Sequence, residues 1–252
     1  MAFIQCQVYS KALVRNTSVN VIYPDHVPEG TPVKVLYLLH GYMGHYMDWV
    51  RLTAIERYIR DYPVCVVMPS GYNHFYTNGP SGNNYFDAVF NDLPETIETM
   101  FHVSKKKEDR YIAGLSMGGY GALKLALTPP YQFHKVASLS GVIDIDALYN
   151  NATNSDYRTK FNQVFKTLPV VGTSDDLYHL FKQANDAKKV PDLFLACGTD
   201  DHLLGHHTKL KSFLSQEKMT YELLETPGGH EWRLWDLYIQ EVIKWMFGEK
   251  KK

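Results

Sequence analysis

The chain has 252 residues, of which 45% are hydrophobic and 21% are charged, as in ordinary water-soluble globular proteins. Its 26 lysine and arginine residues almost balance 27 aspartate and glutamate residues, which argues against a charged surface for nucleic acid or an anionic membrane. No apolar run approaches the roughly 18 residues that span a bilayer, and the amino terminus lacks the pattern of a secretory signal. We therefore expect a cytoplasmic protein that acts on a small molecule, without nucleic-acid or membrane partners.

The three cysteines, Cys6, Cys65 and Cys197, are an odd number and stand far apart. Each has apolar neighbours typical of a strand, and no Cys-x-x-Cys pair is present to hold a metal or carry out redox chemistry. We interpret them as reduced thiols in the core. The lysines at 250–252 are interpreted as a solvated end without a function.

The predicted elements alternate between strands and helices. Residues 3–9 and 17–23 suit neighbouring strands of an antiparallel edge. Apolar runs typical of strands covered on both faces follow at 33–39, 64–68, 111–113, 136–139 and 193–196, and 221–224 is also strand-like. Helical spacing is found at Leu52/Ile55/Ile59, Val89/Leu93/Ile97/Met100, 117–127, Leu210/Phe213/Leu214 and 234–247. This alternation predicts an α/β fold with a mostly parallel central sheet and helices on both faces.

Two long connections interrupt this rhythm. Residues 69–86 are rich in glycine, asparagine and aromatic residues, whereas 144–190 form a polar insertion with weak helical character. Long loops in a compact domain are usually functional or mobile. Pro94 lies within a helical stretch, so that helix is expected to kink or begin there. No repeat or linker divides the chain, which predicts a single domain over 1–252 with a cap-like insertion at about 144–190.

The sharpest local signal is Gly114-Leu115-Ser116-Met117-Gly118, a Gly-x-Ser-x-Gly motif between the strand-like 110–113 and the helix-like 117–127. Small residues two before and two after the serine leave room for a tight strand-to-helix turn that lifts the serine oxygen above the sheet. The helix then points its positive end at the same place. The motif predicts that Ser116 is a nucleophile.

A serine hydroxyl needs a base to take its proton and an acid to orient that base. His230 lies in a short glycine loop, 228–231, between the strand-like 221–224 and the last predicted helix. Asp200 and Asp201 follow a buried-looking strand, and the chain order serine, acid, histidine is that of α/β-hydrolases. Because neighbouring side chains point in different directions, only one of the two carboxylates can reach the histidine.

An oxyanion hole requires two backbone N–H groups aimed at the developing negative charge. Met117 is expected to supply one. The loop 39–44 is expected to supply the other, from Tyr42 with Met43 as the alternative. Aromatic residues around these segments could line an apolar substrate cleft. The alternative interpretation is that they pack in the core. The substrate-binding candidates are Tyr46, Phe75, Tyr76, Tyr85, Tyr120 and Trp232.

Several segments together resemble the bacterial tributyrin esterases, within the group that includes esterase D, S-formylglutathione hydrolases, and feruloyl and acetyl-xylan esterases. They are 38–41 with Trp49, 111–122, 138–141 and 229–232. The resemblance covers nearly the whole chain. It implies the α/β-hydrolase fold and a serine carboxylesterase, without cofactor or metal, that hydrolyses short-chain acyl esters through an acyl-enzyme on Ser116. An S-formylglutathione hydrolase and an acetyl-xylan or feruloyl esterase remain alternatives, and a homo-oligomer is open.

The resemblance also distinguishes the two aspartates. In these esterases the acid stands in a Gly-x-x-Asp-x-Leu arrangement, which in this chain reads Gly198 to Leu203 and selects Asp201. The implied catalytic residues are therefore Ser116, Asp201 and His230. Asp200 would then be a turn residue whose carboxylate accepts hydrogen bonds from nearby backbone N–H groups.

Two other interpretations compete with an esterase. His202, His206 and His207 lie near the aspartate pair, and a four-residue histidine spacing can share one helical face and bind a metal. The glutamate that commonly follows the first histidine of such motifs is missing. The second alternative is an inactive hydrolase that serves as a binding module, against which the complete set of catalytic residue types argues.

Overall fold

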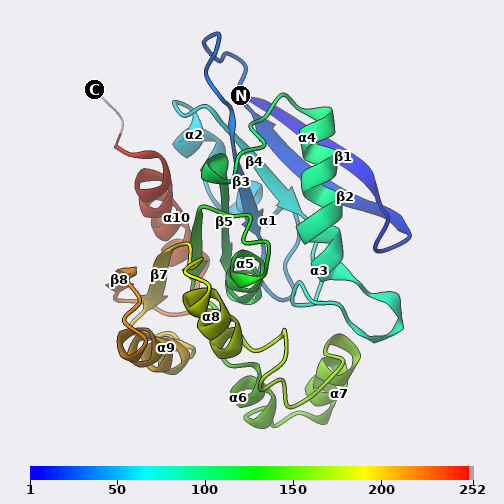
Figure 1. Cartoon of the computed structure of the whole chain (residues 1–252), viewed down its shortest axis with the longest axis vertical. Coiled ribbons are helices and arrows are strands. Elements are labelled where there is room, and N and C mark those ends of the chain that lie inside the picture. Colours follow the sequence, from blue (N-terminus) through cyan, green and yellow to red (C-terminus); the bar gives the residue numbers. More distant parts are fainter. Residues whose placement is uncertain (250–252) are drawn as a thin grey trace.

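The computed structural model describes residues 1–249, and the lysines at 250–252 lie outside the described residues. Within this range eight strands form one sheet in the order β1-β2-β4-β3-β5-β6-β7-β8 (Figure 1). They are β1 (Ala2–Ser10), β2 (Arg15–Tyr23), β3 (Lys34–Leu39), β4 (Val64–Pro69), β5 (Arg110–Leu115), β6 (Lys135–Leu139), β7 (Asp192–Gly198) and β8 (Glu222–Thr226). Strands β3 to β8 are parallel, whereas β2 pairs antiparallel with β1 and β4. The predicted antiparallel edge and parallel body are confirmed.

Helices cover both faces of this sheet, as predicted. They are α1 (Asp48–Leu52), α2 (Ile55–Ile59), α3 (Tyr85–Asp87), α4 (Leu93–Met100), α5 (Met117–Leu127), α6 (Ile145–Asn150), α7 (Ser155–Val164), α8 (Leu177–Asp186), α9 (Leu204–Gln216) and α10 (Trp232–Phe247). Buried residues of α1, α2 and α10 share one apolar cluster, and those of α4, α5, α8 and α9 share the other. Figure 1 shows α4, α5 and α8 in front of the sheet.

Strand β3 explains why the apolar runs are continuous. Leu36 and Leu38 belong to the cluster on one face of the sheet, and Tyr37 and Leu39 to the cluster on the other. A strand with helices on both sides has no solvent-facing side to keep polar. Among residues 1–249, no helix is both long enough and apolar enough to cross a membrane.

Two helical stretches differ in detail from the sequence pattern. The residues expected to form one helix around Leu52 and Ile59 form two, because Thr53 is extended (φ −137°, ψ 171°) and its hydroxyl accepts a hydrogen bond from the N–H of Ile55 at 3.2 Å. Such side-chain bonds compete with the helical ladder. Helix α4 begins at Leu93 with Pro94 in its first turn, after a π-helical turn over Ala88–Asp92. The sequence predicts that the helix kinks or begins at this proline. The helical backbone does not begin there, because the residues from Tyr85 to Asp92 are already helical; the irregularity is the π-helical turn just before Pro94.

The insertion 144–190 is more helical than its sequence suggests. It contains α6, α7 and α8, of which α6 and α7 lie together at the lower end of the molecule in Figure 1. Each begins with a capping side chain, Asp144, Asn154 and Asp176 respectively, that accepts a hydrogen bond from a backbone N–H of the first turn. Such caps replace hydrogen bonds that the helix itself cannot make, so sparse apolar residues suffice to form these helices.

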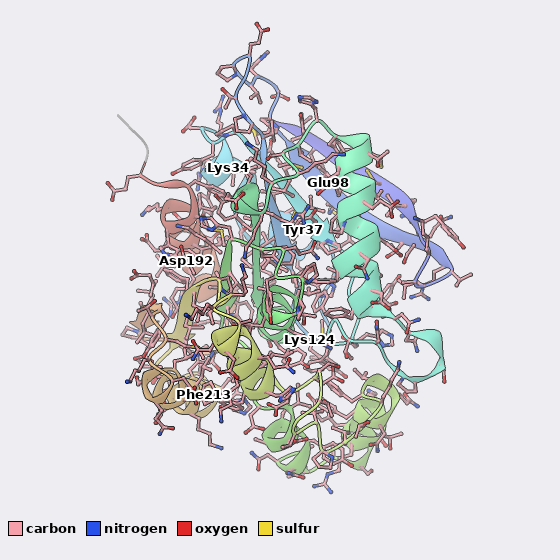
Figure 2. All side chains as sticks on the ribbon, in the orientation of Figure 1. Lys34, Tyr37, Glu98, Lys124, Asp192 and Phe213 are labelled. Atoms are coloured by element: carbon pink, nitrogen blue, oxygen red, sulfur yellow. The ribbon has the colours of Figure 1, made fainter. Side chains whose placement is uncertain are left out.

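A buried charge joins helix α5 to both long loops. Lys124, whose position on α5 is labelled in Figure 2, has a side chain only 3% exposed. Its Nζ donates to Thr77 Oγ1 at 2.6 Å and forms an ion pair with the Asp175 carboxylate. Thr77 donates to the same carboxylate at 2.5 Å. Residues from 69–86 and from 144–190 are thereby tied to one lysine in the interior.

We expect Lys124→Met to lower the free energy of unfolding by about 3–5 kcal/mol, because Asp175 would be left buried without its counter-charge. Urea denaturation measures this change. Lys182→Met is the matched control, since its side chain is 62% exposed, and it should change stability by no more than about 0.5 kcal/mol. Equal effects of the two substitutions would contradict a stabilising role for the buried pair.

Candidate active site

Ser116 occupies the turn between β5 and α5. Its backbone has φ 53° and ψ −117°, a strained conformation for a residue with a side chain. Hydrogen bonds hold the turn on both sides: its N–H donates to Leu139 O at 2.9 Å, and its carbonyl accepts from the N–H groups of Tyr120 and Val142 at 3.1 and 3.2 Å. The serine hydroxyl is therefore presented from the rigid core of the molecule.

Close approach of the backbone explains the two glycines of the motif. A Cβ atom at Gly114 would lie 2.3 Å from the Gly118 carbonyl oxygen. A Cβ atom at Gly118 would lie 2.6 Å from the carbonyl oxygens of Leu39 and His40. Strand β5, helix α5 and the end of β3 meet here, and no side chain fits between them.

The structure brings Ser116, His230 and Asp201 into one chain of hydrogen bonds. Ser116 Oγ lies 3.0 Å from His230 Nε2, and His230 Nδ1 lies 2.9 Å from Asp201 Oδ2. The Asp201 side chain is fully buried. Burial alone would raise its pKa, but hydrogen bonds from His230 and from the N–H of Leu203 outweigh burial, so the pKa of Asp201 lies below its usual value. An ionised Asp201 places the imidazole proton on Nδ1 and leaves the Nε2 lone pair facing Ser116.

These three residues meet because their strands are parallel. Ser116 directly follows β5, Asp201 comes shortly after β7, and His230 comes shortly after β8. The carboxyl ends of parallel strands lie at the same edge of a sheet, where ligands of such folds bind. Far-separated segments of the chain thus converge at one point.

Asp200, the alternative acid, has a different partner. Its Oδ2 accepts a hydrogen bond from the N–H of Gly228 at 3.1 Å, and its own N–H donates to the Gly228 carbonyl at 3.0 Å. Gly228 lies in the loop that carries His230. Asp200 therefore fastens the loop after β7 to the loop after β8, while its neighbour Asp201 contacts the imidazole.

The loop after β3 lies beside Ser116 and contains the candidate second oxyanion donor. The N–H of Met43 donates to Asn73 Oδ1 at 2.7 Å, so the alternative donor is already engaged. Among the hydrogen bonds of residues 1–249, none uses the N–H of Tyr42 or of Met117. Met117 is the first residue of α5, where a helical N–H has no partner within the helix.

His40 fixes this loop and has a role that the sequence analysis missed. Its Nε2 accepts from the N–H of Gly71 at 2.9 Å, and its Nδ1 lies 2.8 Å from Gly41 O. These partners require the Nδ1–H tautomer, and burial lowers the pKa of His40. Tyr76 donates to the His40 carbonyl at 3.0 Å. A His-Gly pair after a strand is too common to have revealed this arrangement, and nothing local singles out Asn73.

Four of the six predicted substrate-binding aromatics are packed in the core. Their residues are no more than 1% exposed, and each tyrosine hydroxyl among them has a hydrogen-bond partner. These four are Phe75, Tyr76, Tyr85 and Tyr120. The structure thus realises the core-packing alternative for them, whereas Tyr46 and Trp232 are partly exposed.

Phe75 belongs to an aromatic cluster that links the loop after β3 to the insertion. Its ring lies 5.8 Å from that of Tyr42 and 5.3 Å from that of Phe161 on α7. Tyr42 also contacts Tyr157 of α7 edge-on, with ring centroids 5.8 Å apart. The loop after β3 and helix α7 therefore share one apolar contact.

The three histidines of the alternative metal site do not converge. His206 accepts hydrogen bonds through Nδ1 from the N–H groups of Ile143 and Asp144. His207 is fully buried, and burial lowers its pKa to about 4. Only His202 faces the hydrogen-bonded chain, with its ring centroid 4.6 Å from that of His230.

The sheet, the strained serine turn and the hydrogen-bonded serine and histidine define a serine hydrolase of the α/β-hydrolase fold. Comparison with known proteins then identifies the family. Residues 10–246 match the family described as "Putative esterase", and the chain belongs to this family. It is a carboxylic ester hydrolase.

Individual relatives agree with this assignment. The chain is 35% identical to an acetyl esterase of Caldicellulosiruptor saccharolyticus, over 98% of both chains. The fluorophosphonate-binding serine hydrolase FphF of Staphylococcus aureus has a TM-score of 0.89 at 31% identity, over 97% of this chain and 98% of that one. The S-formylglutathione hydrolase FrmB of Staphylococcus aureus has a TM-score of 0.86 at 32% identity, with the same coverage.

The different partners of the two aspartates can be tested by asparagine substitutions. Asp201→Asn should lower kcat by about 10⁴, because an amide favours the wrong imidazole tautomer. Asp200→Asn should mainly lower the free energy of unfolding, since it weakens the bond to the histidine loop. Steady-state kinetics and urea denaturation of both variants measure these effects. A collapse of kcat in Asp200→Asn with Asp201→Asn remaining active would reverse the assignment.

Proposed function

We propose that this chain is a serine carboxylesterase that hydrolyses short-chain acyl esters through an acyl-enzyme on Ser116. Its base would be His230 and its orienting acid Asp201. The observation that carries the proposal is the continuous hydrogen-bonded chain from Ser116 Oγ to His230 Nε2, at 3.0 Å, and from His230 Nδ1 to Asp201 Oδ2, at 2.9 Å. This geometry meets the requirements for an activated serine nucleophile.

In the first half-reaction, Ser116 Oγ attacks the ester carbonyl carbon while its proton passes to His230 Nε2. The carbonyl oxygen becomes an oxyanion, and the unengaged N–H groups of Tyr42 and Met117 are the proposed donors to it. The ionised Asp201 stabilises the imidazolium. His230 then gives the proton to the leaving alkoxide oxygen, the alcohol departs, and the acyl group remains on Ser116.

The second half-reaction repeats these steps with water. His230 takes a proton from a water molecule as the water oxygen attacks the acyl carbon, and the same N–H groups would hold the new oxyanion. Return of the proton to Ser116 Oγ releases the carboxylic acid. No step uses a metal or a cofactor, so the activity should survive EDTA.

The preference for short acyl groups rests on how the loops are packed. Phe75, from the loop 69–86, is buried between Tyr42 and the insertion. We propose that these aromatic side chains leave no room for a long acyl chain next to the loop after β3. We propose that residues 144–190 act as a cap over the site. The acetyl esterase relative, 35% identical, agrees with a small acyl group.

A thioester substrate is the second candidate. The resemblance to the S-formylglutathione hydrolase FrmB, with a TM-score of 0.86 over 97% of this chain, favours it. The same serine chemistry cleaves a thioester, with a thiol as the leaving group. An acetyl-xylan or feruloyl ester is a further alternative from the sequence analysis, and the substrate panel below tests it.

The cellular setting is likewise a proposal. The free thiols Cys6, Cys65 and Cys197 support a reducing compartment such as the cytoplasm. A homo-oligomer stays a prediction, which light scattering after size-exclusion chromatography would test.

The nucleophile is tested by Ser116→Ala, which removes the attacking oxygen but little packing. Hydrolysis of p-nitrophenyl butyrate should fall by at least about a thousandfold, and a fluorophosphonate should no longer label the protein. Ser215→Ala, on the exposed surface of α9, is the matched control and should keep full activity. Residual turnover above about a tenth of the wild-type rate would contradict the role of Ser116.

The acyl preference is tested with a panel of p-nitrophenyl esters from acetyl to palmitoyl, together with methyl ferulate and S-formylglutathione. We expect kcat/KM to be higher for butyrate-length esters than for long ones, because the cap limits the cleft. A kcat/KM highest for S-formylglutathione would favour the second candidate. Equal values for butyryl and palmitoyl esters would show that the cleft is deeper than proposed.

A further inference from the structure

We propose that Asp201, His202 and His230 form a binding site for a divalent transition-metal ion such as Zn²⁺, and that the bound ion reversibly inhibits the esterase. The inhibitory part of this inference rests on the proposed role of His230 as the base. The binding part rests only on the arrangement of the three side chains.

The three side chains already have nearly the spacing of metal ligands. Asp201 Oδ1 lies 3.1 Å from His230 Nδ1 and 3.6 Å from His202 Nδ1. One ligand atom from each of the three residues lies within 4.8 Å of the others, the one such group among residues 1–249. Tetrahedral zinc with bonds of about 2.0–2.1 Å separates its ligand atoms by roughly 3.3–3.5 Å. Small side-chain movements therefore suffice to close the site.

The site has an entrance and a rigid base. The His202 side chain is 67% exposed, so an ion can approach from solvent on that side. The Asp201 carboxylate is fully buried and also accepts a hydrogen bond from the N–H of Leu203 at 2.8 Å, the kind of supporting contact that orients metal ligands. Two imidazoles and one carboxylate are a ligand set suited to Zn²⁺, with water in the fourth position.

Inhibition follows from the proton count of His230. A neutral imidazole has one N–H and one lone pair, and the hydrogen-bonded chain places the N–H at Nδ1 and the lone pair at Nε2. When Nδ1 binds the ion, its proton leaves to solvent and Nε2 takes up a proton, so the ring remains neutral. Nε2 is then a donor and can no longer accept the proton of Ser116. The serine oxygen stays protonated and unreactive.

Substitution of His202 tests metal binding separately from catalysis, because this residue takes no part in the proposed mechanism. Without His202, only Asp201 and His230 remain as protein ligands. The ion must still break the hydrogen bond between these two residues, but it gains two protein ligands instead of three. His202→Asn should therefore keep the metal-free activity while weakening metal binding by at least tenfold. His102→Asn, at an exposed histidine far along the chain, is the matched control and should change neither.

Binding is measured by titrating ZnCl₂ into the Ser116→Ala protein in a calorimeter, where turnover plays no part. We expect one ion per chain, and at least tenfold weaker binding in Ser116→Ala/His202→Asn than in Ser116→Ala/His102→Asn. Equal affinities in these two double variants would overturn the metal site. Because the measurement needs no hydrolysis, it stands even if the proposed esterase chemistry fails.

Inhibition is measured on the otherwise wild-type enzyme with p-nitrophenyl butyrate. Zn²⁺ should abolish turnover at saturation, EDTA should restore it, and His202→Asn should raise the half-inhibitory zinc concentration at least tenfold. Equal zinc sensitivity of His202→Asn and His102→Asn would overturn the proposal. Binding by calorimetry without loss of turnover would overturn its inhibitory part.

Discussion

The tight turn at Ser116 is the constraint on which the rest of the site depends. Its positive φ of 53° is held by hydrogen bonds to Leu139 at the end of β6 and to Val142 after it, and the backbone around it packs too closely for any side chain at Gly114 or Gly118. Strain of this kind persists only where the surrounding structure over-determines it. The position of Ser116 is therefore set by the sheet, and His230, Asp201 and the loop after β3 are arranged around it.

Three polar side chains fasten the other loops, the exposed Asp200 and the buried His40 and Lys124. Asp200 joins the loop after β7 to the loop after β8, His40 joins the loop after β3 to Gly71, and Lys124 joins α5 to both long connections. For the buried Lys124–Asp175 pair, hydrogen bonds to the charged groups contribute about 1.5–3 kcal/mol each, and leaving one charge unpaired costs more. These contacts connect the loops around Ser116 to one another and to α5.

The sequence predicted those features that depend on a short stretch of neighbouring residues. Continuous apolar runs indicated the parallel strands, and the glycine pattern indicated the turn at Ser116. The partners of Lys124 could not be found in this way, because Asp175 lies 51 residues further along the chain and nothing near it marks the pairing. The buried Phe75 and the partly exposed Tyr46 are both aromatic residues of loops, so residue type does not distinguish core from cleft. The capping residues Asp144, Asn154 and Asp176 could have indicated the helices of the insertion. The low hydrophobicity of this segment led instead to the expectation of weak helical character.

The contact between Tyr42 and Tyr157 links two parts that are usually considered separately. Tyr42 belongs to the loop proposed to stabilise the transition state, and Tyr157 belongs to α7 of the insertion proposed to cap the substrate site. A change in α7 that shifts Tyr157 would therefore also act on Tyr42, whose N–H is a proposed donor to the reacting carbonyl oxygen. Substitutions in α7 that alter the acyl preference would then act on turnover as well as on affinity, which limits how freely this helix can change.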